Sequence, residues 1–330
     1  MRRSTIFLFL TLTLSSAVAL AQGQPVVRLD REIVLSGVRG RIDHLAADVA
    51  GFRVFVCALG NSTVEVVALN QGRQVGSITQ QKEPQGVVYV PRNKTLYVAT
   101  GGDGAVRSYD AGTLKPLKMV DLGDDADNLR YDATRRRILA GFGAGGIAEL
   151  GLDLTVRRKI ALPVHPEAFD ISPDGARLFV NLPLQMSIAT IDLKTYAVNA
   201  TWGHPGTLAN FPMAIDATQQ RLLIACRMPA RLLMVNTANG AVTARMKTVG
   251  DADDLFYDAA HGVAYVIGGG GFVDVVRVGP GDNFSSLSHI ATAAGARTGL
   301  YVPEWNKLVV AAPRNGASAA RLLVFSVAYP

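Results

Sequence analysis

The chain has 330 residues, of which 49% are hydrophobic and only 18% are charged. This composition excludes an intrinsically disordered protein, which would be poor in apolar residues and rich in charge. Two cysteines are too few for a small scaffold held together by disulfides. A net charge of +6 is compatible with binding to an anionic surface but does not by itself indicate such binding.

The first 21 residues have the pattern of an export signal. A pair of arginines precedes an apolar stretch, and a small-x-small cleavage site lies directly before Gln22. We therefore expect residues 1–21 to be a Sec-type signal peptide and residues 22–330 to form one domain that is periplasmic or secreted. No stretch reaches the roughly 18 uninterrupted apolar residues of a membrane helix, so no membrane span is expected.

One sequence pattern recurs about every 43 residues through the rest of the chain. Its seven units begin at Arg41, Glu83, Asp125, His165, Ala209, Asp251 and Gly295. In the first unit, residues 45–48, 53–58, 63–69 and 74–78 alternate apolar and polar side chains between turn residues, which predicts four antiparallel strands. Seven such units predict an all-β, seven-bladed β-propeller with four-stranded blades, because a β-sandwich would not explain the regular repeat.

The two ends of the repeat region complement each other. The last unit supplies only three strands, of which the third covers residues 322–327. Residues 26–35, ahead of the first full unit, are β-rich, so we expect this N-terminal strand to join the last blade. That pairing would close the ring and remove exposed sheet edges. Cys57 and Cys226 fall in non-adjacent blades, so we expect two buried free thiols.

The units resemble the YVTN-type repeats of YncE-like bacterial propellers, most closely in LYVATGGDGAVRSYD at Leu96–Asp110. The resemblance covers nearly all of the chain beyond residue 21 and implies an exported seven-bladed propeller. YncE itself is associated with DNA binding, but no motif in this sequence carries that property over. Propeller relatives include lactonases and lyases, so the fold leaves the function open.

Two sets of loops should emerge at one mouth of the central channel: those that lead into the innermost strands and those that join the second and third strands. Loops on a rigid scaffold commonly carry function. Alignment of the units places a ring of residues there: Asp43, Gln85, Asp127, Glu167, Phe211, Asp253 and Arg297. Nearby positions add Arg41, His44, Asn128, His165, Arg227 and Asp254. We predict that this largely acidic mouth is the ligand-binding site.

Carboxylates crowded in a narrow mouth repel one another, so some must be paired, protonated or bound to a metal ion. In blade order Arg297 falls between Asp253 and Asp43, and Arg41 lies beside them, which indicates a self-neutralising arc. A structural role is also open, because carboxylates in such loops can fasten neighbouring blades through hydrogen bonds.

Three functions remain open. The first is a non-catalytic exported binding protein that holds a small ligand, a metal ion or a protein partner at the mouth. The second is a hydrolase or lyase in which His165, Glu167 and His44 are the candidate catalytic residues, with Asp127 and a divalent cation polarising the substrate. Oxygen ligands suit Ca²⁺ or Mg²⁺, whereas an added histidine admits Zn²⁺, Mn²⁺ or Fe²⁺. The third is a nucleic-acid or envelope-binding module. We expect a monomer, and no cofactor beyond such a cation.

Overall fold

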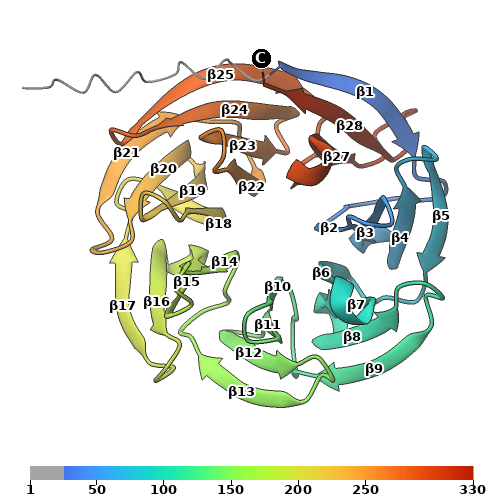
Figure 1. Ribbon diagram of the computed structural model, residues 1–330, viewed down its shortest axis with the longest axis horizontal. Coiled ribbons are helices and arrows are strands. Elements are labelled where there is room, and N and C mark those ends of the chain that lie inside the picture. Colours follow the sequence, from blue (N-terminus) through green and yellow to red (C-terminus); the bar gives the residue numbers. More distant parts are fainter. Residues whose placement is uncertain (1–25, 330) are drawn as a thin grey trace, which may run out of the picture.

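The computed structural model describes residues 26–329, which form seven four-stranded antiparallel sheets arranged in a ring (Figure 1). The predicted seven-bladed β-propeller is confirmed. The predicted signal peptide, residues 1–21, lies outside the described residues. Within residues 26–329, the helical segments are five short 3₁₀ turns, and no helix is long and apolar enough to cross a membrane.

The blades follow one another in chain order. Blades 1 and 2 contain β2 (Leu45–Asp48), β3 (Arg53–Ala58), β4 (Thr63–Ala68), β5 (Arg73–Ile78), β6 (Pro84–Val90), β7 (Thr95–Thr100), β8 (Ala105–Asp110) and β9 (Pro116–Asp121). Blades 3 and 4 contain β10 (Leu129–Asp132), β11 (Arg137–Phe142), β12 (Gly146–Gly151), β13 (Val156–Ala161), β14 (Phe169–Ile171), β15 (Arg177–Leu182), β16 (Ser187–Asp192) and β17 (Val198–Gly203).

The remaining three blades have the same antiparallel order. Blades 5 and 6 contain β18 (Leu208–Asp216), β19 (Arg221–Met228), β20 (Ala230–Asn236), β21 (Val242–Lys247), β22 (Ala252–Asp258), β23 (Val263–Gly268), β24 (Phe272–Gly279) and β25 (Asn283–Ala291). Blade 7 contains β26 (Thr298–Val302), β27 (Lys307–Ala312), β28 (Arg321–Ala328) and β1 (Val26–Val34). The 3₁₀ turns are Leu59–Asn61, Pro91–Asn93, Gly101–Asp103, Pro183–Gln185 and Pro303–Trp305.

The position of a strand in its blade explains its residue pattern. The second and third strands, such as β3 and β4, are almost wholly buried because both of their faces pack against neighbouring blades. The fourth strand, such as β5, alternates exposed and partly buried residues because one face meets solvent. The first strand of each blade faces the central channel (Figure 1). The hydrophobic core is therefore divided among the contacts between adjacent blades.

Partly or fully buried arginines connect adjacent blades at several points of the ring. In blade 1, Arg53 pairs with Asp48 at 2.8 Å and donates to the carbonyl oxygen of Ala111, which follows β8 of blade 2. Arg137 and Arg221 occupy the same position in blades 3 and 5, and each pairs with an aspartate five residues earlier. These interactions fix the angle between blades and hence the positions of the channel loops.

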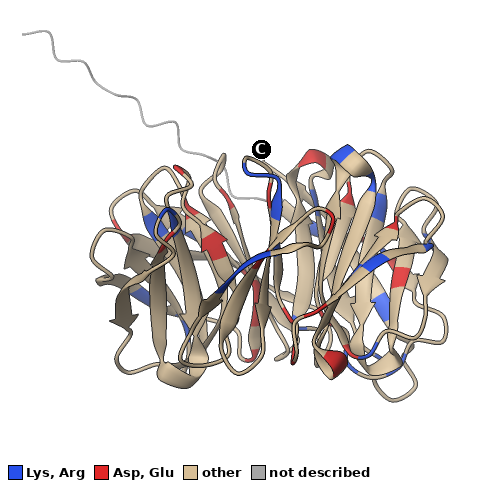
Figure 2. Cartoon of the chain, turned by 90° about the horizontal axis from the view of Figure 1, so that it is seen from below, with Lys and Arg blue, Asp and Glu red and all other residues tan. Residues whose placement is uncertain are grey.

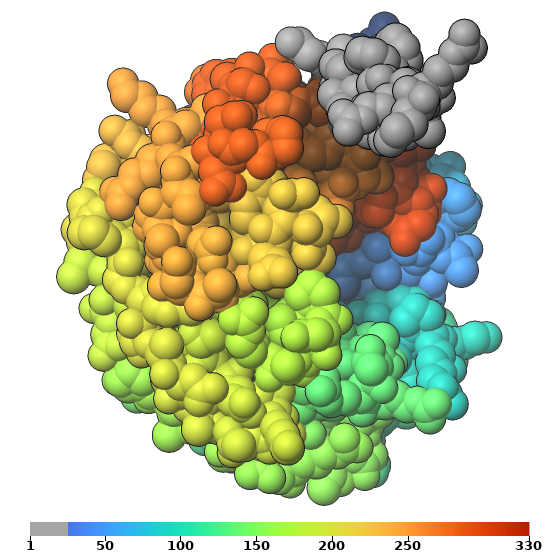
Figure 3. All heavy atoms as spheres, turned by 60° about the vertical axis from the view of Figure 1, so that its left-hand side comes forward, coloured from blue at the N-terminus to red at the C-terminus, as the bar shows by residue number. Residues whose placement is uncertain are grey.

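The N-terminal strand completes blade 7, as predicted. β1 pairs antiparallel with β28 from Val26 opposite Ala328 to Val34 opposite Arg321, with one irregularity near Leu29. Figure 1 shows β1 beside β28, and in the space-filling view the orange-red part of the chain lies next to light-blue atoms of blade 1, where the ring closes (Figure 3). The closed ring leaves no blade with a missing strand. Both cysteines of the chain are buried free thiols, which confirms that expectation as well.

Candidate functional site

Three predicted site residues converge at the channel mouth. Asp127 precedes β10, and His165 and Glu167 precede β14 of the next blade. One ligand atom from each of the three lies within 4.8 Å of the others. The backbone holds these positions, because the N–H of Asp127 donates to Gly141 and the N–H of Glu167 donates to Asn181, each at 3.0 Å. The inner-strand loops are thus fixed by the second strands of their own blades.

His165 has a defined ring orientation. Its Nδ1 lies 2.6 Å from the carbonyl oxygen of Gly143, and because a carbonyl only accepts, Nδ1 is the donor. Nε2 lies 3.7 Å from Asp127 and so faces the cluster. Burial alone would lower the pKa of His165, but the neighbouring Asp127 and the bond to Gly143 raise it to about 9. In the absence of another cation, the imidazolium therefore supplies positive charge to this cluster.

Glu167 is a partly buried carboxyl group without a hydrogen-bonding partner among residues 26–329. Within residues 26–329, its side chain makes no hydrogen bond and no ion pair. Burial raises the pKa of Glu167 well above its usual range, and the charges of Asp127 and Asp253 add to this effect. A carboxyl group in this state is stabilised by a proton or by a bound cation.

The predicted self-neutralising arc forms with one change of partner. Arg41 contacts Asp43 at 2.7 Å and lies 4.0 Å from Asp253, as the blade order suggests. Arg297 pairs with Asp251 at 2.9 Å instead of bridging Asp253 and Asp43. Burial raises the pKa of Asp43 to about 7, although the nearby basic groups act in the opposite direction. The arc neutralises only part of the acidic mouth.

Arg227, which stacks on Phe211 of its own blade, links blade 5 to blade 6. The guanidinium of Arg227 lies 3.6 Å from the ring centre of Phe211, donates to Asp253 at 2.5 Å and donates to the carbonyl of Ala252 at 3.0 Å. It also lies 3.5 Å from Asp251. Two hydrogen bonds and the ion pair with Asp253 engage this charge, so Arg227 holds the shape of the mouth instead of offering a free charge.

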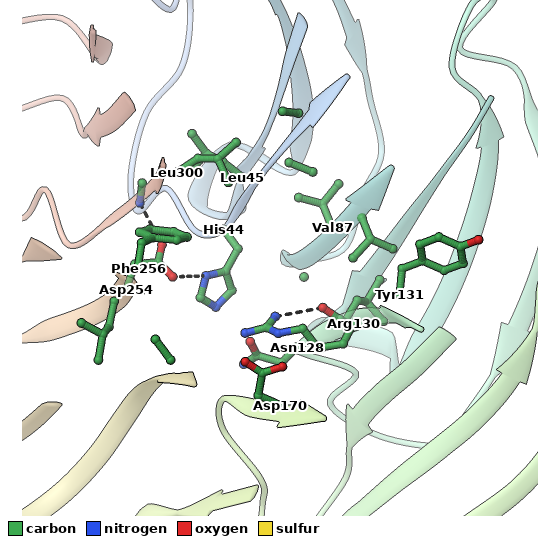
Figure 4. Close-up of a pocket in the computed structure, with 18 of the residues that line it drawn as sticks. His44, Leu45, Val87, Asn128, Arg130, Tyr131, Asp170, Asp254, Phe256 and Leu300 are labelled. Carbon is green, nitrogen blue, oxygen red and sulfur yellow. Dashed lines mark hydrogen bonds and ion pairs between the residues drawn. The ribbon is translucent and has the colours of Figure 1, made fainter. Parts of the chain in front are cut away.

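His44 points into the channel and connects three blades. Its Nδ1 lies 3.2 Å from Asp254, which accepts a hydrogen bond from the N–H of Gly299 at 2.8 Å (Figure 4). Burial alone would lower the pKa of His44, but the charge of Asp254 and its hydrogen bond raise it to about 10. The charged pair ties blade 1 to blades 6 and 7. Gln85 similarly donates to Asp125 at 3.0 Å and connects blades 2 and 3.

A cavity of about 470 Å³ lies inside the channel, between the inner strands. Figure 4 shows the predicted site residue Asn128 beside Arg130 and Asp170, on the side of blades 3 and 4. The sequence alignment did not select Arg130 or Asp170. The available signal was a charged residue three positions beyond the ring, where the other inner strands carry apolar side chains such as Val88 and Phe256.

Charge is mixed over the outside of the ring. In the side view, Lys and Arg are interspersed with Asp and Glu instead of gathering on one face (Figure 2). A nucleic-acid-binding surface is normally a clustered basic patch. The acidic mouth is therefore a more distinctive feature than any basic surface of residues 26–329.

Fold and mouth together define a seven-bladed β-propeller with a polar channel entrance, and solved structures agree on the fold. Kuenenia stuttgartiensis hydrazine synthase matches with a TM-score of 0.72 and 14% identity, covering 84% of this chain and 95% of that one. A chain of a mitotic checkpoint complex matches with a TM-score of 0.76 and 14% identity, covering 98% of both chains. At this identity the likeness concerns the fold alone. No family model and no curated protein matches the sequence, so the YncE-like resemblance stays a prediction.

Proposed function

We propose that this propeller is a binding protein whose channel mouth holds a divalent cation through Asp127, His165 and Glu167. The observation that carries the proposal is the convergence of their ligand atoms within 4.8 Å. Ligands on opposite sides of one ion, each at about 2.0–2.6 Å, are roughly 4–5 Å apart. A single cation placed between these three residues is therefore within reach of all of them.

The donor set favours particular ions. One imidazole nitrogen with two carboxylates suits Zn²⁺ or Mn²⁺ better than Ca²⁺ or Mg²⁺, which prefer oxygen ligands throughout. The bond from His165 Nδ1 to Gly143 supports the proposal, because ligating histidines usually donate their other ring nitrogen to a carbonyl or carboxylate. Glu167 would gain the partner that it otherwise lacks.

The surroundings of the cluster fit a partner that approaches from solvent. Arg41 lies at the mouth with 47% of its side chain exposed, so an incoming small ligand or protein could contact it beside the cation. We propose that the protein is exported and acts as a monomer, as the N-terminal sequence and the closed ring suggest. A hydrolase or lyase at the same mouth would use the same cation, so cation binding is the first property to test.

The test is a thermal-shift measurement with Zn²⁺ and Mn²⁺, and with Ca²⁺ and Mg²⁺ for comparison. At a concentration a hundredfold above Kd, a bound ion stabilises the folded state by about 2.7 kcal/mol. For a domain of about 300 residues this raises the unfolding midpoint by about 4 °C. The double variant His165→Ala with Glu167→Gln should lose the shift, whereas His289→Ala, a matched change on the outer strand β25, should keep it.

Two results would contradict the proposal. One is a parent protein that responds to none of the four cations. The other is a double variant that responds as strongly as the parent, which would move the binding to other residues. If the double variant is much less stable than the parent in the absence of any cation, the role of Asp127, His165 and Glu167 is to hold neighbouring blades together.

A further inference from the structure

The channel cavity is a second site with its own chemistry. None of Asp127, His165 and Glu167 lines it. Its middle ring is formed by the residues three positions beyond the mouth ring in each blade: Ala46, Val88, Arg130, Asp170, Ala214, Phe256 and Leu300. This ring is apolar apart from one arginine and one aspartate. The volume of the cavity, about 470 Å³, falls within the range of sites that enclose small organic molecules.

The guanidinium of Arg130 has few partners. It donates to the carbonyl of Leu129 at 2.9 Å and lies 5.7 Å from the ring centre of Phe169. Within residues 26–329 it makes no ion pair. A guanidinium has five N–H donors, so most of them remain available to a ligand in the cavity. A half-buried cation that makes no ion pair is unfavourable, which makes this position attractive to an anion.

Two neighbouring groups support this interpretation. Asn128 is only 2% exposed, and its Oδ1 has no hydrogen-bonding partner among residues 26–329. Its amide lies beside Arg130 in the cavity wall (Figure 4), and because a carboxylate only accepts hydrogen bonds, the Nδ2 of Asn128 is the atom that would contact such a ligand. Burial raises the pKa of Asp170, although the charge of Arg130 opposes this effect. Asp170 lies beside Arg130 but makes no ion pair with it among residues 26–329 (Figure 4).

We propose that the channel binds a small organic carboxylate, with its acid group on Arg130 and its apolar body against Val88, Phe256 and Leu300. The planar fork of arginine matches a carboxylate through two parallel hydrogen bonds. The apolar ring favours a ligand with a hydrocarbon portion over inorganic phosphate, which would lose its hydration there. This site goes beyond the cation proposal and uses different residues, so either can fail without the other.

The experiment is calorimetric titration of the purified protein with phenylacetate, and with phenylacetamide as its uncharged counterpart. We expect phenylacetate to bind and phenylacetamide to bind at least about tenfold more weakly, because only the acid forms charge-assisted hydrogen bonds with Arg130. Arg130→Gln should weaken phenylacetate binding by at least about tenfold. Arg92→Gln, a matched change at an exposed turn, should leave it unchanged.

Two further variants keep the test decisive if Arg130→Gln folds poorly. Arg130→Lys keeps the positive charge but lacks the fork, so phenylacetate affinity should fall between those of the parent and Arg130→Gln. Asp170→Asn removes the competing acid, so affinity should rise. The proposal is wrong if phenylacetate does not bind, if the amide binds equally well, if Arg130→Lys binds as tightly as the parent, or if inorganic phosphate binds more tightly than phenylacetate.

Discussion

Replacement of Ile33 by alanine tests whether β1 closes the ring as one cooperative unit. Ile33 faces inward, with only 1% of its surface exposed, and packs into a core shared by blades 1 and 7. The adjacent Val34 faces outward and is 53% exposed. Val34→Ala is therefore a matched control on the same strand, because it leaves the pairing with β28 in place and removes no buried contact.

The expected effect follows from burial. Truncation of a buried isoleucine to alanine destabilises a protein by about 2–5 kcal/mol. The entropy of unfolding, about 2.1 cal/mol/K per residue, is about 0.6 kcal/mol/K for a domain of this size. A loss of about 3 kcal/mol therefore lowers the unfolding midpoint by about 5 °C. Val34→Ala should change the midpoint by less than about 1 °C, since surface substitutions usually stay within about 0.5 kcal/mol.

The chain has two tryptophans, so the unfolding of two different blades can be followed separately by fluorescence. Trp202 lies on β17 in blade 4, and Trp305 lies in the turn after β26 in blade 7. Single-tryptophan versions, made with Trp305→Phe or Trp202→Phe, report each blade by fluorescence during heating. Ile33→Ala should lower both transitions equally. If only the Trp305 transition moves, the ring does not unfold as a unit and the closure reasoning is refuted.

Three other predictions concern the interior. Arg137→Met should lower the unfolding free energy by about 3–5 kcal/mol in urea denaturation, because it removes the buried cation that pairs with both Asp132 and Glu149; a loss below about 1 kcal/mol would contradict this. Because the folded pKa of His44 is about 10, its stabilising contribution is complete below pH 6.5 and declines toward pH 10, at most about 1.4 kcal/mol per pH unit. Thermal midpoints across this range should therefore fall less steeply in His44→Gln than in the parent, and equal slopes would contradict the assignment. Gly86→Ala would place a Cβ 2.0 Å from the carbonyl oxygen of Asp127, so it should weaken Zn²⁺ binding, and an unchanged Kd would show that this backbone position does not matter.

The fold could be predicted from the sequence because each blade repeats the same local pattern. The expected strands at 45–48 and 53–58 match β2 and β3, and the other two strands of blade 1 differ by one residue at one end. Strand position depends on side-chain alternation and turn residues, both of which are local. Ring closure was also predictable, since a three-stranded last unit requires a partner.

The pairing of side chains at the mouth was less predictable. Alignment placed Arg297 between two aspartates, but its contact with Asp251 depends on side-chain reach across a blade boundary. Arg227 was expected to line a pocket, and its contacts with Phe211 and Asp253 depend on the packing of two blades. Such contacts join residues that are distant in sequence. Arg130 could have been found by extending the same alignment by three positions beyond Asp127.

The way blade 7 is assembled has a consequence for the order of folding during synthesis. Ser326 of β28 donates to the carbonyl of Arg28 of β1, 298 positions earlier in the chain. At about 5–20 residues per second, the ribosome needs about 15–60 s to produce that partner. During this time β1 has a free edge that could pair with another chain. Its exposed charges, including Arg28, Asp30 and Glu32, discourage such pairing, so the strand with the longest delay before pairing carries its own protection against aggregation.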